Sequence, residues 1–187
     1  MIEYTVTEAK INTASKIFYS DLNISNSEIQ SFISFANKTG DHQNRKTNVK
    51  ADMSEWSIWT KTSIYDSVLE AVSDMVNNTT TDWLMKDYNG GVYKIKNVWL
   101  ATYRKGDYTK AHTHGPESWA SFVFFIKNDD NNTPLIFKGL QDYLFEPVVG
   151  RVVIFPSYLE HYVPVIESDS ERIVLAGNIV YVPSNKE

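Results

Sequence analysis

The hydrophobic pattern changes character at about residue 91, and this change limits the folds open to the chain. From there on, short runs rich in Val, Ile, Phe, Tyr and Trp alternate with sequences rich in Asn, Gly and Pro, as expected of β-strands joined by turns. The predicted strands are Val92–Tyr103, Trp119–Ile126, Leu135–Phe137, Arg151–Phe155 and Ile173–Val182.

Helical patterns are confined to the residues before this point. Ser25 and Glu28 form a candidate capping box ahead of a first amphipathic helix, and Gly40 lies beyond its end. A second helix is predicted to stop at Asn77 and Asn78, and the polar stretch at about residues 38–53 is expected to be a loop. The apolar positions of the two helices are Ile29, Phe32, Ile33 and Phe35, then Ile64, Val68, Leu69, Val72, Met75 and Val76.

Helices first and many short strands afterwards predict a mainly β fold, a β-sandwich or jelly roll braced by N-terminal helices. A length of 187 residues favours one domain over two. We therefore expect a single domain over residues 1–187, with a helical support segment at 1–90 and the jelly-roll core at 91–187.

Composition excludes several classes of function. Charged residues of both signs are interspersed and the formal net charge is −5, so nucleic acid is not an expected partner. No apolar run approaches the roughly 18 residues of a membrane span, and the N-terminus lacks the organisation of a signal peptide. A soluble, cytoplasmic protein without membrane attachment is expected. The chain has no cysteine, which excludes thiolate metal sites and cysteine nucleophiles, so any metal must be held by nitrogen and oxygen.

Three of the four histidines fall beside predicted strands. His112 and His114 have period-two spacing, so in an extended segment both imidazoles project from the same face and can reach one metal. His161 follows a strand and a turn, which places it at a strand rim as well. A single histidine of this kind is often a surface or core residue, and a structural zinc site usually has four closed ligands, often thiolates. Together, the three favour an open, redox-capable metal site.

Two segments resemble the prolyl-hydroxylase-like members of the 2-oxoglutarate/iron(II) oxygenase superfamily. Tyr103–His114 is similar to the stretch Tyr-x-x-Gly-x-x-x-x-x-His-x-Asp of that family, and Gly150–Asn178 is similar to its Gly-x-hydrophobic-Phe-Pro, distal His and Arg pattern. The spacing also fits, with 49 positions from His112 to His161 and 11 from there to Arg172. The chain resembles in particular a small group of oxygenase-like proteins, frequent in phage genomes, that carry His-x-His in place of His-x-Asp.

The resemblance covers roughly residues 93–182 and implies a double-stranded β-helix, the cupin-like jelly-roll barrel, with Fe(II) at its mouth and the helices on the outside of its major sheet. It implies that His112 and His161 are catalytic metal ligands and that Arg172 holds the distal carboxylate of 2-oxoglutarate. An arginine suits this task because its planar fork pairs with both carboxylate oxygens. The Tyr103 hydroxyl is a candidate second contact to the same carboxylate.

His114 stands where the family usually has Asp. We favour a site of three histidines, in which neutral imidazoles coordinate and three iron positions stay open for the 2-oxo acid and O₂. The alternative is that His114 does not coordinate and that a carboxylate or water replaces it, with Glu117 preferred over Asp107. Replacing a carboxylate by imidazole raises the net charge of the site by one.

Two other classes remain as alternatives. A cupin-type metalloenzyme is suggested by Gly106, His112, His114 and Glu117, which approach the first cupin motif, although Gly150 lies too far before His161 for the second motif. A non-catalytic jelly-roll binding protein is the other class, and it gives no reason for retaining the histidines and Arg172 together.

The expected reaction is hydroxylation of an organic substrate, a small molecule or a peptidyl residue, with O₂ consumed and succinate and CO₂ released. A proline residue in a peptide is the family analogy. Dimerisation is left open, and, if phage-encoded, the protein would act in the host cytoplasm. Trp56, Trp59 and Trp99 are interpreted as core residues, with the pocket entrance as the alternative.

Overall fold

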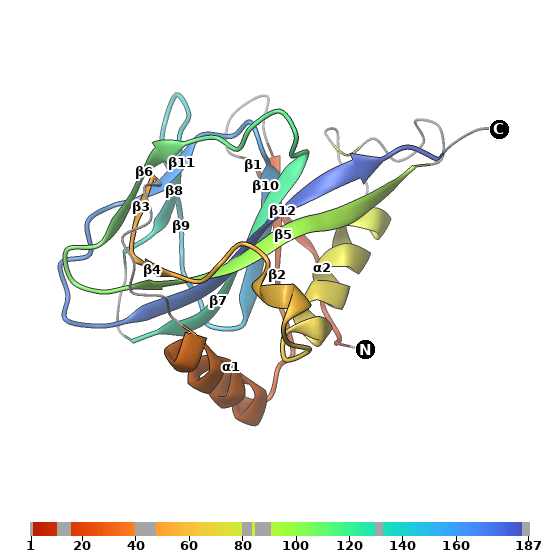
Figure 1. Cartoon of the computed structure of the whole chain (residues 1–187). Helices are drawn as coiled ribbons and strands as arrows, with labels where there is room; N and C mark the ends of the chain where they lie inside the picture. The colour runs from red at the N-terminus through yellow and green to blue at the C-terminus, as the bar shows by residue number, and fades with distance from the viewer. Residues whose placement is uncertain are drawn as a thin grey trace.

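The computed structural model describes residues 2–10, 16–39, 48–79, 84, 91–129 and 133–184. Two β-sheets face each other, and two helices cover the outer face of the larger sheet (Figure 1). Within the described residues the elements are β1 (Thr7–Lys10), β2 (Lys16–Asp21), α1 (Asn26–Thr39), β3 (Val49–Lys50), β4 (Asp52–Met53), η1 (Ile58–Thr60), α2 (Asp66–Asn78), β5 (Val92–Tyr103), β6 (Tyr108–His112), β7 (Ala120–Asn128), β8 (Leu135–Phe137), β9 (Tyr143–Phe145), β10 (Arg151–Pro156), β11 (His161–Val163) and β12 (Arg172–Val182).

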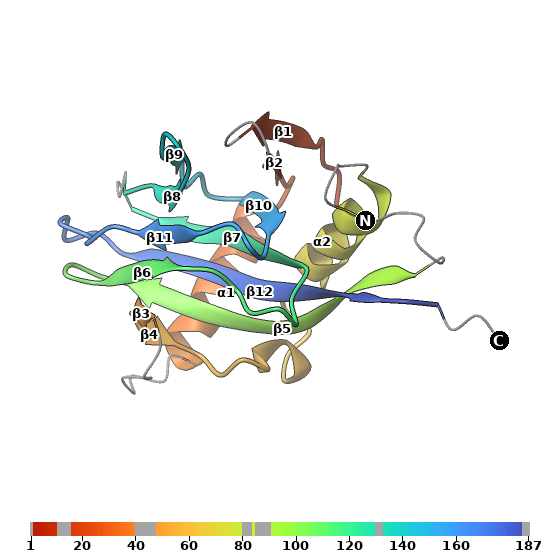
Figure 2. The same cartoon turned by 90° about the horizontal axis from the view of Figure 1, so that it is seen from above.

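The major sheet has seven strands in the order β1-β2-β10-β7-β12-β5-β4, and the minor sheet has five in the order β3-β6-β11-β8-β9, both counted over the described residues. Seen from above, β6 and β11 run across one face of the long strands β5, β7 and β12 (Figure 2). This is the jelly-roll architecture predicted from the second half of the sequence. The ends of the five predicted strands differ from those of β5, β7, β8, β10 and β12 by at most two residues, whereas β6, β9 and β11 were not predicted as strands.

The two sheets and the helices enclose two separate cores because inward and outward side chains alternate along each long strand. On β12, Ile173 and Leu175 face the helices, whereas Val174 and Ala176 face the minor sheet. The helix-side core also contains Phe32 of α1 and the apolar face of α2. The helices therefore brace the outside of the major sheet, as expected.

Helix α1 begins where the sequence predicts. The backbone N–H and the side chain of Ser25 both bond to a Glu28 carboxylate oxygen, at 3.0 and 2.6 Å, and the Glu28 N–H is 3.3 Å from the Ser25 hydroxyl oxygen. This is the reciprocal capping box, which satisfies backbone donors at the helix start. Helix α2 ends at Asn78, also as predicted, and Gly40 lies outside the described residues.

The first 90 residues are not purely helical, which corrects one expectation. β2 pairs with β10 and carries β1 on its other side, β4 pairs with β5, and β3 joins the minor sheet beside β6. The predicted loop at about 38–53 accordingly contains β3 and β4, while residues 40–47 lie outside the described part of the chain. Short strands of this kind are stabilised by pairing with a sheet edge, and their local sequence carries little periodicity.

No helix among the described residues has both the length and the apolar character needed to span a bilayer.

Candidate metal centre and adjoining pocket

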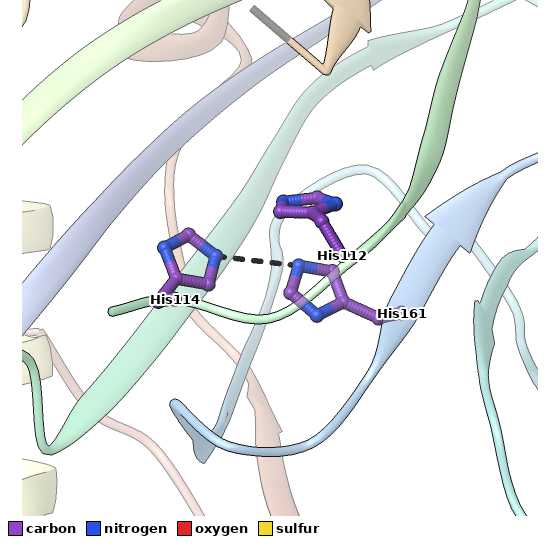
Figure 3. Close-up of side chains that lie close together, drawn as sticks. All are labelled: His112, His114 and His161. Atoms are coloured by element: carbon purple, nitrogen blue, oxygen red, sulfur yellow. Dashed lines mark hydrogen bonds between the residues drawn. The ribbon is translucent and has the colours of Figure 1, made fainter. Parts of the chain in front are cut away.

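Two strands of the minor sheet bring the three predicted histidines together. His112 ends β6 and His161 begins β11, and the two are register partners in the antiparallel pair. His114 lies two residues beyond His112, in the segment that continues past the strand. The three side chains point toward one another (Figure 3), and their ligand nitrogens all lie within 4.8 Å of one another.

The imidazoles are closely packed. The ring centroids of His112 and His161 are 4.4 Å apart, and those of His114 and His161 are 5.1 Å apart. The Nε2 atoms of His114 and His161 lie at 3.3 Å (Figure 3). Three nitrogens that converge in this way can be shared by a single metal ion.

Backbone carbonyls fix the ring orientation of two of the histidines. Nδ1 of His112 lies 2.8 Å from the carbonyl oxygen of Lys110, and Nδ1 of His161 lies 2.9 Å from that of Leu159. A carbonyl oxygen can only accept, so Nδ1 carries the proton in both rings and the Nε2 lone pair is free. This is the tautomer that a metal ligand needs.

The surroundings keep all three imidazoles neutral. Burial lowers the pKa of His161 well below its usual value, and the neighbouring His112 and His114 lower it further. Burial, followed by the proximity of His112, lowers the pKa of His114 to about 4, although a side-chain hydrogen bond with Asn178 opposes the shift. Burial also lowers the pKa of His112, against a hydrogen bond to the backbone of Lys110. Neutral imidazoles coordinate metals, so the site is prepared for binding at neutral pH.

A pocket between the two sheets extends from the histidines into the barrel. Its wall is predominantly apolar, with Ala101, Val123, Phe125, Val174 and Ala176 contributed by the major sheet. Arg172, Tyr103 and Thr109 line it as well. The pocket therefore joins a candidate metal site to a buried cation.

Arg172 is the first residue of β12, and its side chain is 1% exposed. Its Nε donates a 3.4 Å hydrogen bond to Oδ1 of Asn128, and a terminal guanidinium nitrogen donates to the carbonyl oxygen of Thr133. No carboxylate forms an ion pair with this guanidinium among the described residues. Burial lowers the pKa of Arg172 to about 10, against the effect of nearby Tyr103, so the group stays charged at pH 7.

Tyr103 is the register partner of Arg172 on β5. Its hydroxyl lies 2.8 Å from the Thr109 hydroxyl, and burial raises its pKa. Two hydroxyl groups thus accompany the guanidinium in the same lining.

The alternative carboxylates lie apart from the histidines. The Glu117 side chain is 81% exposed and forms a 2.5 Å ion pair with Lys96. Asp107 accepts a 2.8 Å hydrogen bond from the backbone N–H of Arg104. The group of potential metal ligands found at this place in the described residues consists of the three histidines alone.

The three tryptophans take different places. Trp99 lines the pocket and also belongs to the core between the sheets, and its ring stacks at 6.3 Å on that of His114. Trp56 is partly exposed and packs on Trp99 with a ring separation of 4.7 Å. Trp59 packs against the helix-side core.

Three polar residues near the site were not predicted from the sequence: Thr109, Ser121 and Asn178. Asn178 and Ser121 are buried polar residues at positions of β12 and β7 that face the minor sheet, where the next inward residues are apolar. A polar residue in the inward phase of an alternating strand is a usable sequence signal, because burial without a partner is costly.

One family model matches part of the chain. Residues 138–178 match the family described as "Putative 2OG-Fe(II) oxygenase". The matched segment includes His161 and Arg172, whereas His112 and His114 precede it. No curated protein sequence matches the chain.

Solved structures of 2-oxoglutarate oxygenases share the fold. A 2-oxoglutarate complex of a viral collagen prolyl hydroxylase from Paramecium Bursaria Chlorella virus-1 superimposes with a TM-score of 0.68 at 18% identity, covering 87% of this chain and 94% of that one. A prolyl-4-hydroxylase from Pseudomonas putida gives 0.63 at 13% identity over 95% and 92% of the two chains. HygX from Streptomyces hygroscopicus, with nickel, 2-oxoglutarate and hygromycin B bound, gives 0.61 at 9% identity over 90% and 83%.

The segment match and the shared jelly-roll fold agree with the resemblance seen in the sequence.

Proposed function

We propose that the chain is a dioxygenase that hydroxylates an organic substrate at the expense of O₂ and 2-oxoglutarate, releasing succinate and CO₂. The observation that carries this proposal is the pairing of two features in one apolar pocket: three converging neutral histidines and a buried arginine without an acidic partner among the described residues.

The donor set suits Fe(II). His112 and His161 would bind it through Nε2, since their Nδ1 protons are held by backbone carbonyls, and His114 would be the third ligand. Bound Fe(II) supplies open coordination positions for a 2-oxo acid and for O₂ activation. The protein's own part is to keep the imidazoles neutral and converging, which burial and close packing of the rings achieve.

Arg172 would anchor the distal carboxylate of 2-oxoglutarate. A buried guanidinium in an apolar pocket is costly unless an anion compensates it, and among the described residues only the Asn128 amide and the Thr133 carbonyl are its hydrogen-bond acceptors. A dicarboxylate with one end at the histidines would bring the other end into this pocket. Tyr103 and Thr109 can add hydroxyl contacts to that carboxylate.

The apolar wall between these two ends would exclude water from the bound 2-oxo acid. A low-dielectric wall also strengthens the pairing of Arg172 with a carboxylate. Together these effects favour a small dianion with an apolar middle, which is the shape of 2-oxoglutarate.

A peptidyl residue is our first candidate for the substrate. The proteins with similar folds include prolyl hydroxylases from a virus and from Pseudomonas putida, and the fold analogy is what supports this choice. HygX, with hygromycin B bound, shows that the same fold also takes small molecules. A small-molecule substrate is therefore the alternative.

Calorimetric titration of the Mn(II)-loaded protein with 2-oxoglutarate tests the proposal. We expect saturable binding in the wild type and a loss of affinity in Arg172→Ala. Arg104→Ala is the matched control, because Arg104 is exposed and paired with Asp52 and Glu171 on the surface. A wild type that binds Mn(II) but not 2-oxoglutarate would contradict the oxygenase function and favour a cupin-type metalloenzyme. A wild type that binds neither would favour a non-catalytic binding protein.

A further inference from the structure

Arg172 is the middle residue of a row that crosses three neighbouring strands of the major sheet. Its register partners are Asn128 on β7 and Tyr103 on β5. The pairing of β12 with β7 shifts register between Ile173 and Val174, so a bulge adjoins this position and re-aims the end of β7. Directly paired residues project from the same face of a sheet, and Arg172 and Tyr103 line the pocket. The Asn128 side chain therefore lies on the pocket face as well.

The side-chain amide of Asn128 accepts a hydrogen bond from the guanidinium. Nε of Arg172 donates to Oδ1 of Asn128 at 3.4 Å, while a terminal nitrogen donates to the carbonyl oxygen of Thr133. An arginine side chain has only donors, so the amide must turn its oxygen toward it. Both acceptors are neutral. They can orient the guanidinium, but neither compensates its charge.

The two carboxylates that adjoin this row in the sequence, Glu171 and Asp129, are paired elsewhere. Lys127 bridges them, with Nζ 2.7 Å from a carboxylate oxygen of Asp129 and 3.1 Å from one of Glu171. Lys127 is the register partner of Ile173, whose side chain faces the helices, so this cluster of charges lies on the outer side of the sheet. The pocket face of the row therefore holds a buried guanidinium with no carboxylate partner in the described part of the chain.

We propose that Asn128 is a positioning residue for Arg172: its neutral amide oxygen holds the guanidinium without neutralising it, so that the positive charge is left for the distal carboxylate of 2-oxoglutarate. This inference rests on the proposed function in one point, that Arg172 binds this carboxylate. A carboxylate at position 128 would also hold the guanidinium, but it would occupy the cation and repel the incoming anion. The neutrality of the acceptor is thus as important as the hydrogen bond.

Calorimetric titration of the Mn(II)-loaded protein with 2-oxoglutarate separates the two requirements. Asn128→Ala removes the acceptor and keeps the position neutral, and we expect it to weaken 2-oxoglutarate binding by about threefold to tenfold. Asn128→Asp keeps an acceptor and adds a charge, and we expect a larger loss, of roughly 100-fold. A purely structural hydrogen bond predicts the reverse order of the two variants, because a carboxylate is the stronger acceptor for a guanidinium.

Lys127→Gln is the matched control for charge. It makes the protein more negative by one charge, as Asn128→Asp does, at the neighbouring residue but on the outer side of the sheet. We expect this variant to bind 2-oxoglutarate like the wild type. The Mn(II) affinity should be the same in all of these proteins, because the candidate metal ligands belong to other strands. A loss in Lys127→Gln equal to that in Asn128→Asp would show a long-range charge effect and overturn the role of Asn128.

The Nε–H signal of Arg172 in a ¹H–¹⁵N spectrum reports the contact without 2-oxoglutarate, and its loss in Arg172→Lys assigns it. We expect a signal protected from exchange with water in the wild type, because the Arg172 side chain is 1% exposed. Its chemical shift should change in Asn128→Ala, since the acceptor of this proton is removed, and stay the same in Lys127→Gln. An identical shift in the wild type and in Asn128→Ala would overturn the inference.

The failure of this inference can be told apart from that of the proposed function. If the wild type does not bind 2-oxoglutarate, or if Arg172→Ala binds it equally well, the anchoring role of Arg172 is wrong and the inference falls with it. If Arg172→Ala weakens binding but Asn128→Asp binds at least as tightly as Asn128→Ala, the role of Asn128 alone is wrong. If Asn128→Asp does not fold, the affinity of Asn128→Ala and the Nε–H signal still decide the matter.

Discussion

His112 and His161 face each other as register partners across β6 and β11, with ring centroids 4.4 Å apart. A cross-strand pair brings side chains on one face of a sheet within about 5 Å of each other, whatever their separation in the sequence. The pairing therefore places two of the three candidate metal ligands through the backbone ladder itself, and His114, the third candidate, comes from the segment that follows.

Removal of either paired histidine should abolish metal binding. We expect His112→Ala and His161→Ala to show no measurable affinity for Fe(II), or for Mn(II) or Ni(II) as substitutes, because each change removes one of the two candidate ligands that the pairing of β6 and β11 holds face to face. Metal content after reconstitution and calorimetry check this result. Full occupancy in either variant would show that the residue concerned is not a ligand.

Replacement of the third histidine separates the two candidate ligand sets. His114→Asp should preserve Mn(II) binding, because it restores the usual two-histidine, one-carboxylate set, and His114→Ala should weaken binding. Glu117→Gln should have no effect, since Glu117 is exposed and paired with Lys96. A loss of Mn(II) affinity in Glu117→Gln, with none in His114→Ala, would transfer the role to the carboxylate.

Arg172→Ala should weaken 2-oxoglutarate binding to the Mn(II) form by roughly two to three orders of magnitude, because losing one partner of a buried ion pair costs about 3–5 kcal/mol. Mn(II) affinity should stay unchanged. Arg172→Lys should recover only part of the loss, since a lysine cannot form the bidentate contact. Titration of the three proteins with 2-oxoglutarate gives the comparison, and equal affinities would exclude Arg172 as the anchor.

Tyr103→Phe tests the second contact to the same carboxylate. The hydroxyl of Tyr103 lies beside that of Thr109 in the pocket lining. Its removal would take away one hydrogen bond to the charged carboxylate of 2-oxoglutarate, worth about 1.5 kcal/mol, and would leave the packing of the ring intact. We expect 2-oxoglutarate binding to weaken by roughly tenfold. An unchanged dissociation constant would assign Tyr103 to the core alone.

The metal-free protein should lose stability as the pH falls below about 6.5. The folded-state pKa of His161 is lowered well below its unfolded value, so between the two pKa values the unfolded chain binds the proton and the folded chain does not. The contribution of His161 is fully present above the unfolded pKa and is lost as the pH falls, with a slope of at most about 1.4 kcal/mol per pH unit. His114 acts in the same direction down to about pH 4.

Urea unfolding at pH 7 and pH 5 in the presence of a chelator measures this effect. His161→Gln, which cannot titrate, should show a smaller difference between the two pH values than the wild type. An identical pH dependence in the two proteins would mean that His161 is not held neutral by the fold.

Local patterns in the sequence determine the elements that are long or carry their own start signals. The Ser25–Glu28 capping box sets the start of α1, and strong β-propensity over Val92–Tyr103 determines β5, because these signals depend on neighbouring residues only. The common face of His112 and His114 is likewise a property of period-two spacing. These features can be predicted from the amino-acid sequence without knowledge of the packing.

Tertiary pairing decides the rest. β1 to β4 exist as strands because they add to sheet edges formed by residues far along the chain, and β11 is a three-residue strand that is defined by β6 and β8. The same pairing places Asn178 beside Ser121, and Glu117 lies on the surface with Lys96. The sequence alone determined which residue types could bind a metal and an anion; the sheet register decided which of them meet, because hydrogen-bonded pairing between distant strands has no local signal.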